Sequence, residues 1–428
     1  MRPIVPQTEP ASRASAMAAT RLERASQRSH RSARPAHQAP VVTATVPAVV
    51  EEPAEATSAK ADDKALLASQ SVAIGKDDLL LGLTSATLRR QIASLPDDAI
   101  DQAKRLNPLH DAIGVHGLDG YANQELVKVR TKTKGGSVCQ ELRGRGEPGV
   151  GRATHFLSWW LGNPLEGVLS AIEAYEAEHP ELDRDRTFWW VCDFSIPQND
   201  TKAPVEQLPE IVKAIGHTVL LLEPWHAPAP LGRAWCVYEV YHTQKSGAKF
   251  EVAMSAEQRE AFETALVDEF DTIKGTVAKV DVRECKSRDE EKTKWILGEL
   301  ERDVGLLECN RLVIGQLNGA LAAQGRAALD RMPAAERGTS VLLNQVGMLL
   351  KAQGDLEGAA ALYREALQAK RETLGDRHPN TLISISNFYQ LLHQQGQDDE
   401  QHGRPRLRLR CGIRVIVLSG LCTVSTWH

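Results

Sequence analysis

Residues 217–241, with the sequence HTVLLLEPWHAPAPLGRAWCVYEVY, contain the pattern that decides the fold of the central part of this chain. The segment opens with a short apolar run bounded by turn residues, which predicts a buried strand. Pro228 and Pro230 stand where a helix is about to begin, a position that tolerates proline. Trp235 and Glu239 follow, four residues apart, so they share one face of that helix. Both lie beyond the carboxyl end of a strand, where open α/β sheets form their binding sites.

The alternation of strand-like and helix-like patterns extends to both sides of this segment. Strands are predicted from short apolar runs at residues 153–160, 187–194, 217–225, 249–255 and 275–282. Amphipathic helices are predicted between them, at residues 164–179, 204–215 and 255–270. This alternation indicates an α/β fold in which helices cover both faces of a parallel sheet. Six of the eight tryptophans lie between residues 159 and 235, which places the main core here.

The composition is that of an ordinary globular protein. The 428 residues are enough for about two or three domains, and the net charge of −5 gives no general attraction to nucleic acid or to anionic membranes. The seven cysteines form no CxxC pair, which disfavours a zinc site or a disulfide framework and favours a reducing, cytoplasmic compartment. Because no apolar run approaches about 18 residues, no membrane span is expected.

The first 150 residues divide into two segments of different character. Residues 1–75 are rich in Ala, Ser, Pro, Thr and Arg and nearly lack aromatic residues, so a disordered tail is expected. An Arg-rich, acid-poor start is also typical of an organelle transit peptide, so import into an organelle is the alternative to a cytoplasmic location. Residues 76–150 carry short helical patterns, with Ser85 as a candidate cap, and form a predicted helical lead-in to the α/β domain.

An internal repeat defines the C-terminal part of the chain. Residues 287–335 have a helical pattern throughout and are expected to bridge to the segment 336–400. Within that segment, VGMLLKAQGD (346–355) aligns with FYQLLHQQGQ (388–397) at an offset of 42 residues, which is typical of stacked helical hairpins. The basic tail at 401–428 fits neither copy of the repeat, and its origin is unclear.

This segment resembles the tetratricopeptide repeat, in the form found in kinesin light chains. The connector of that form, LG…HP.T, is present as Leu374, Gly375, His378, Pro379 and Thr381. The chain lacks the heptad region of a kinesin light chain and holds only about one and a half repeats. The resemblance implies that the segment binds a protein or peptide partner.

The region 151–286 resembles a Toll/interleukin-1 receptor (TIR) domain, most closely the plant type. The family has a Phe-x-Ser motif after its first strand, an acid on its second, and a Trp-Cys-x-x-Glu helix after its third. The matching positions here are Phe156, Leu157, Ser158, Asp193, Leu208, Ile211, Ile215, Trp235, Cys236 and Glu239. The resemblance implies a flavodoxin-like parallel sheet with helices on both faces, and self-association in signalling.

The same resemblance implies a candidate catalytic residue. In family members that cleave the nicotinamide–ribose bond of NAD⁺, the Glu of the last motif assists the reaction, and Glu239 occupies that position. A carboxylate suits this chemistry because it can stabilise an oxocarbenium-like centre. NAD⁺ would be a substrate, and neither a cofactor nor a metal is implied. The substrate-binding residues that the resemblance implies are Phe156, Ser158, Trp160, Asp193 and Trp235.

Two functions therefore remain open. The first is a signalling adaptor, in which the TIR-like domain self-associates and the repeat binds a partner. The second is an NAD⁺ nucleosidase that uses Glu239, although Trp160 stands where plant members often have an Arg. A pocket beside Glu239 would favour the enzyme, and a carboxylate paired outside any cleft would favour the adaptor. Neither function involves nucleic acid.

Overall fold

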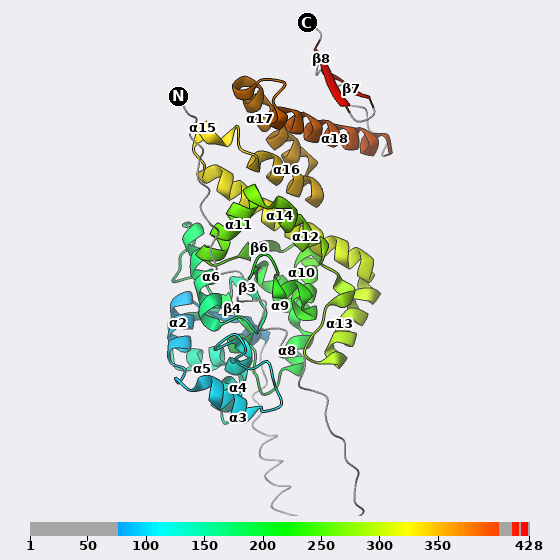
Figure 1. Cartoon of the computed structure of the whole chain (residues 1–428). Helices are drawn as coiled ribbons and strands as arrows, with labels where there is room; N and C mark the ends of the chain where they lie inside the picture. The colour runs from blue at the N-terminus through cyan, green and yellow to red at the C-terminus, as the bar shows by residue number, and fades with distance from the viewer. Residues whose placement is uncertain (1–75, 402–412, 419–420, 427–428) are drawn as a thin grey trace, which may run out of the picture. The chain divides into compact units, whose positions relative to one another are not determined.

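The computed structural model describes residues 76–401, 413–418 and 421–426 and shows a sheet surrounded by helices, followed by further helices (Figure 1). All of these residues belong to one unit of the chain, Gln70–His428. The tail expected at residues 1–75 lies outside the described residues, so its predicted disorder stays a prediction.

Six strands form one mixed sheet. They are β1 (Leu81–Leu83), β2 (Val150–Arg152), β3 (His155–Ser158), β4 (Trp189–Trp190), β5 (His217–Leu221) and β6 (Lys249–Ala253). Their order in the sheet is β2-β1-β4-β3-β5-β6. Strands β4, β3, β5 and β6 run parallel to one another, whereas β1 is antiparallel to both of its neighbours. The α/β class predicted from the sequence is confirmed, and the expectation of a wholly parallel sheet is wrong.

The segment 275–282, predicted as a fifth strand, is not a strand. It lies in α12 (Phe270–Ala278) and in the loop and 3-10 turn η3 (Val282–Glu284) that follow. Ile273 and Val277 are four residues apart and both are buried, so they form the inward face of a helix. A short apolar run is compatible with either structure, and here packing of one helix face decided the outcome.

The predicted lead-in at residues 76–150 contains helices, but it also supplies two strands of the sheet. Its helices are η1 (Lys76–Leu80), α2 (Ser85–Ala93), α3 (Ala99–Leu106), α4 (Gly120–Thr131) and α5 (Val138–Gly144). The cap of α2 is Thr84, one residue before the predicted Ser85, and its side chain accepts a hydrogen bond from the Thr87 N–H. Strands β1 and β2 are each three residues long, too short to produce a recognisable period of two.

Each face of the sheet has its own hydrophobic core, because alternate residues of a strand point to opposite faces. Phe156 and Trp190 lie in the first core, while their neighbours Leu157 and Trp189 lie in the second. The first core includes α9 (Leu208–Ile215), α10 (Ala234–Ser246) and α11 (Ala256–Asp268). The second includes α2, α5 and α6 (Leu165–Glu178). Helices therefore cover both faces, as the alternating sequence pattern predicts.

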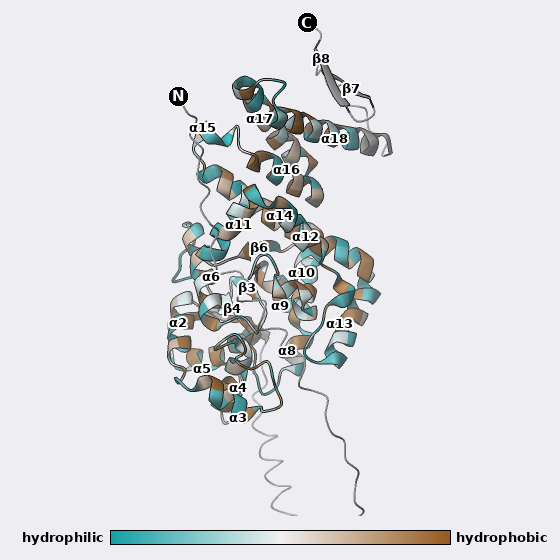
Figure 2. Cartoon of the chain, viewed as in Figure 1, coloured by the Kyte–Doolittle hydropathy of each residue, from teal (hydrophilic) through white to brown (hydrophobic). Residues whose placement is uncertain are grey.

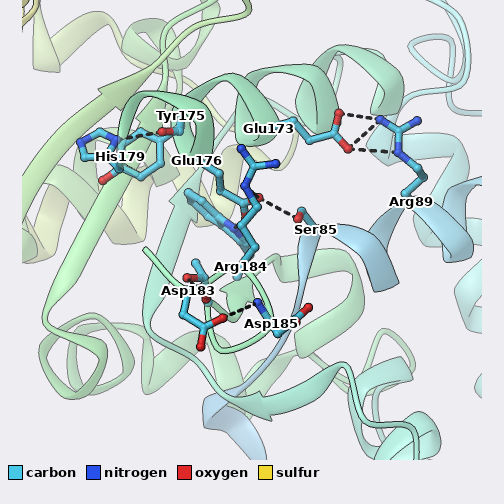
Figure 3. A network of polar contacts seen from close by, with 11 residues as sticks. Ser85, Arg89, Glu173, Tyr175, Glu176, His179, Asp183, Arg184 and Asp185 are labelled. Carbon is cyan, nitrogen blue, oxygen red and sulfur yellow. Dashed lines mark hydrogen bonds and ion pairs between the residues drawn. The ribbon is translucent and has the colours of Figure 1, made fainter. Parts of the chain in front are cut away.

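A buried carboxylate ties α2 to α6 and to β4 (Figure 3). Glu176 is 2% exposed, and its two oxygens accept hydrogen bonds from Ser85 Oγ and from Trp189 Nε1, each at 2.8 Å. Nearby on the surface, Arg89 donates to both carboxylate oxygens of Glu173. Because a buried carboxylate is strongly unfavourable without donors, the bonds to Glu176 fix the lead-in against the sheet domain.

The C-terminal part of the described chain is helical. Its helices are α13 (Glu290–Asp303), α14 (Leu306–Arg331), α15 (Ala334–Arg337), α16 (Leu342–Gln353), α17 (Leu356–Leu374) and α18 (Pro379–Gln401). Figure 2 shows brown, hydrophobic residues alternating with teal ones along α16 and α17. Helix α14 contacts both α10 and α16, and the first core continues from β5 through α14 to Tyr363 of α17. The short repeat segment thus packs on the bridging helices.

The remaining elements are short. They are α7 (Cys192–Ser195), α8 (Lys202–Glu206), η2 (Ala229–Gly232) and an antiparallel pair of strands, β7 (Ile413–Leu418) and β8 (Leu421–Thr426). The helix predicted at 204–215 is therefore divided between α8 and α9. In the part of the chain that the structure describes, none of the helices is long and apolar enough to cross a membrane.

The packing of α16 against α17 leads to a first prediction. A Cβ added at Gly347 would lie 2.4 Å from Cε1 of the buried Tyr363 ring. We expect Gly347→Ala to lower the free energy of unfolding by about 1–3 kcal/mol because of this overlap. Gly315→Ala in α14 is the control, since outside its own stretch of helix backbone no atom of the described residues lies within 4 Å of its added Cβ. Alanine should raise stability there by up to about 1 kcal/mol.

Urea unfolding followed by far-UV circular dichroism would measure both changes. An equal effect of the two substitutions would contradict the close contact between Gly347 and the Tyr363 ring.

Candidate functional site

A pocket of about 420 Å³ lies at the carboxyl ends of β3 and β4. Its walls are the turn after β3, the start of α7, the first turns of α10, and the segment between η3 and α13, with additional residues of α4 and α8. After β3 the chain continues to α6 on one face of the sheet, and after β4 it continues to α9 on the other. Such a divergence opens a crevice at the edge of a doubly wound sheet, where ligands bind.

Glu239 lines this pocket from α10, one helical turn after Trp235. Its carboxyl oxygen Oε2 accepts a hydrogen bond of 2.5 Å from Ser158 Oγ, at the end of β3. Burial raises the pKa of Glu239 to about 8, and the Ser158 hydrogen bond opposes that rise. Both the neutral and the ionised form are therefore populated near neutral pH, which suits a group that handles protons or stabilises positive charge.

The structure distributes the other expected site residues over two layers. Trp160 and Trp235 line the pocket together with Glu239. Ser158 is fully buried beneath it and holds the Glu239 carboxyl. Phe156 is not part of the wall: it is buried and stacks on Trp190, with ring centroids 4.6 Å apart and an interplanar angle of 16°.

Asp193 also lies behind the pocket rather than in its wall. Its side chain is fully buried, and its Oδ2 accepts a hydrogen bond of 3.1 Å from Asn123 Nδ2. Burial raises the pKa of Asp193 to about 7, while the hydrogen bond from Asn123 lowers it. In this position Asp193 connects the end of β4 to α4, which the sequence analysis did not associate with the site.

Arg233 is a pocket residue that the sequence analysis missed. Its guanidinium lies over the Trp160 ring, 4.9 Å from the ring centroid, in a cation–π arrangement. A cation is therefore present beside Trp160 in the wall of the pocket. Arg233 stands two residues before Trp235, at the start of α10, and this proximity in the sequence could have indicated it. Its contact with Trp160 depends on the fold.

The cysteines near the site are neutral thiols. Burial raises the pKa of Cys236 and of Cys192 well above the ordinary value, and the nearby Glu239 carboxyl adds to the effect at Cys236. The Cys236 thiol donates to the backbone oxygen of Trp159 at 3.4 Å. A thiol that stays protonated is a poor nucleophile, so Cys236 contributes packing.

The histidines at the start of the sheet strands lie away from the pocket. His155 and His217 begin β3 and β5, at the opposite end of the strands, and His217 Nε2 is 2.7 Å from Glu251 Oε2. Burial lowers the pKa of His155 to about 3. Among the described residues, no group of His, Cys, Asp and Glu could hold a metal ion.

The raised pKa of Glu239 leads to a prediction about stability. The folded-state value of about 8 exceeds the ordinary 4.5, so the folded protein keeps a proton that the unfolded chain releases. This contribution to stability is present below about pH 4.5 and is lost as the pH rises towards about 8. Glutamine stays neutral at every pH. We therefore expect the stability of Glu239→Gln relative to the wild type to increase over this range.

Differential scanning calorimetry between about pH 5 and 8 would check this. The control is Glu260→Gln, which removes an exposed carboxylate from α11. A difference in midpoint between Glu239→Gln and the wild type that does not vary with pH would contradict the prediction.

The family model of the tetratricopeptide repeat matches residues 339–380. This range includes the whole of α16 and α17. No curated protein and no solved structure matches the chain. Because such repeats bind partners on the surface of stacked helical hairpins, the match supports a protein-binding role for the C-terminal segment.

Proposed function

We propose that this chain is an intracellular signalling adaptor that joins a TIR-like domain to a protein-binding segment of the kinesin-light-chain type. The observation that carries the proposal is the tetratricopeptide repeat at 339–380. The repeat packs on α14, and α14 packs on α10 of the α/β domain. A partner bound to the repeat would therefore be held beside that domain, which is what an adaptor has to achieve.

The strand order supports a TIR-like assignment of the α/β domain. The four parallel strands occur along the chain in the order β3, β4, β5, β6, and they lie in the sheet in the order β4-β3-β5-β6. Numbered by their occurrence in the chain, these strands have the spatial order 2-1-3-4. This is the beginning of the 2-1-3-4-5 order of flavodoxin-like sheets. Trp235, Cys236 and Glu239 lie on α10, the α-helix that follows the third parallel strand, and this arrangement supports the TIR-like proposal. We extend the proposal to self-association through this domain and to a cytoplasmic location.

Helix α18 offers a surface for the partner. Ile383 is 52% exposed and Tyr389 is 41% exposed, although most apolar side chains of the repeat are buried. Aromatic and aliphatic side chains that are exposed in one partner commonly become buried in an interface. Both positions follow the repeat match at 339–380 on the last described helix.

Crosslinking of the full chain in cell extract, followed by mass spectrometry, tests the adaptor function. We expect Ile383→Asp combined with Tyr389→Asp to abolish the crosslinks, because a carboxylate in a buried interface is strongly unfavourable. The matched control is Leu109→Asp combined with Val115→Asp, in the loop before α4, where the side chains are 95% and 62% exposed. The proposal fails if both pairs have the same effect or if no partner is crosslinked.

A second candidate function, NAD⁺ cleavage, is favoured by one specific observation. Glu239 lines a pocket instead of being paired on an open surface, and Ser158 orients its carboxyl. When the nicotinamide–ribose bond breaks, its electron pair leaves with nicotinamide and the ribose carbon becomes cationic. An ionised Glu239 would stabilise that cation, and water would then add to the carbon and release a proton, giving ADP-ribose.

Incubation of the full chain with NAD⁺ tests this chemistry. We expect NAD⁺ to be consumed, and consumption to rise with pH up to about 8, because the ionised form of Glu239 becomes more abundant. Glu239→Gln should reduce consumption by roughly 100-fold or more, whereas Glu260→Gln should leave it unchanged. Equal consumption by the wild type and Glu239→Gln, or none by either, would rule out Glu239 as a catalytic residue.

A further inference from the structure

Four cations around the Glu239 pocket form no ion pair with the residues that the structure describes. Arg233, Lys286, Arg288 and Lys292 line the pocket, and none of them forms an ion pair with another residue that the structure describes. The fifth cation of the wall, Lys128, is paired with Glu125 at 3.0 Å. Four unpaired positive charges repel one another when they are brought together, so this arrangement favours a negatively charged ligand.

Backbone contacts bring these cations to one side of the pocket. Arg233 and Lys286 form a parallel β-bridge, in which Lys286 N donates to Gly232 O at 3.0 Å and Lys286 O accepts from Ala234 N at 3.1 Å. Residues paired in this way project their side chains to the same side. The positions of Arg288 and Lys292 follow from the start of α13, which Asp289 caps by accepting a hydrogen bond from the N–H of Lys292.

The acids in the wall do not cancel this charge. Asp289 and Glu239 are the carboxylates that line the pocket with the five cations. Asp289 is engaged in the cap of α13, and Glu239 accepts from Ser158. The wall therefore carries a clear excess of positive charge, in a chain whose net charge is −5.

Aromatic rings and a weakly satisfied donor complete the lining. Arg233 lies over Trp160, and Arg288 lies over Tyr121, 5.2 Å from the ring centroid. Trp159 is 5% exposed, and its Nε1–H lies against the Cys192 thiol, which is a weak acceptor, without a well-formed hydrogen bond to any described residue. A ligand oxygen would be a stronger acceptor for this buried donor. Flat rings such as Trp160 and Trp235 suit stacking with a base.

We propose that this pocket binds a nucleoside diphosphate group, with its phosphates among Arg233, Lys286, Arg288 and Lys292 and its base against the tryptophans. Arg and Lys are the residues that proteins use for phosphate, through charge-assisted hydrogen bonds. The pocket volume of about 420 Å³ lies within the usual range of small-molecule sites. The ligand would connect α10 to the start of α13, two segments from different parts of the chain.

This inference uses the same pocket as the second candidate function but does not depend on catalysis by Glu239. A nucleoside diphosphate group occurs both in NAD⁺ and in ligands that are only bound. Three of the four cations, Lys286, Arg288 and Lys292, come after η3 in the chain, at the beginning of the segment that leads to the repeat. Binding of the phosphates would thus involve the segment that bridges towards the repeat.

Isothermal titration calorimetry with the full chain tests the site, using ADP, adenosine and inorganic pyrophosphate as probes. We expect ADP to bind, pyrophosphate to bind more weakly, and adenosine not to bind. Raising the salt concentration should weaken ADP binding, because the interaction is largely between charges. Neutralising the cations by Lys286→Gln, Arg288→Gln and Lys292→Gln together should weaken ADP binding by roughly 10- to 100-fold.

Lys294→Gln is the matched control, because it removes an exposed cation from the same helix but outside the pocket wall. It should bind ADP as the wild type does, and circular dichroism would verify that the triple variant is folded. The proposal is overturned if ADP does not bind, if adenosine binds equally well, or if the triple variant keeps full affinity. A chain that binds ADP but leaves NAD⁺ intact retains this site and loses the second candidate function.

Discussion

The burial of two consecutive tryptophans on β4 is the constraint on which the α/β domain depends. Trp189 and Trp190 point to opposite faces of the sheet, so each lies in a different core. Both are at most 1% exposed, and a buried indole N–H requires an acceptor. Trp189 donates to Glu176 and Trp190 to the backbone oxygen of Leu79, each at 2.8 Å. A strand of two residues thereby holds both α6 and the lead-in in place.

The candidate site follows from this arrangement. Phe156 stacks on Trp190 beneath the pocket, and the next residues of β3 lead to Ser158, which holds the Glu239 carboxyl. The surrounding core removes water from Glu239 and so raises its pKa, while the rim of the pocket carries cations that form no ion pair within the described part of the chain. Inner layer and rim thus differ in polarity: the inner layer controls the protonation of one carboxyl, and the rim is suited to a phosphate-bearing ligand.

The repeat and the pocket share neighbouring elements. Helix α10 carries Glu239 and packs on α14, and α14 packs on α16 of the repeat. Helix α13, whose first turn supplies Lys292 to the pocket, also contacts α10 and α14. A ligand in the pocket and a protein on the repeat would therefore act on helices that touch one another. This proximity gives the proposed adaptor function and the proposed ligand site a common structural basis.

The sequence alone determined the α/β class, four of the six strands of the main sheet, most of the helices and the repeat, because these features depend on local periodicity. It also placed Trp235 and Glu239 on one helix face. Only the tertiary structure decided that β1 and β2 join the sheet, since three-residue strands have no periodic signal and form through pairing with distant segments. The same holds for the pocket: Arg233 and Lys286 are more than fifty residues apart, and the β-bridge that joins them exists only in the folded chain. The clustering of these cations depends on contacts between residues far apart in the sequence, and a local sequence pattern cannot predict such contacts.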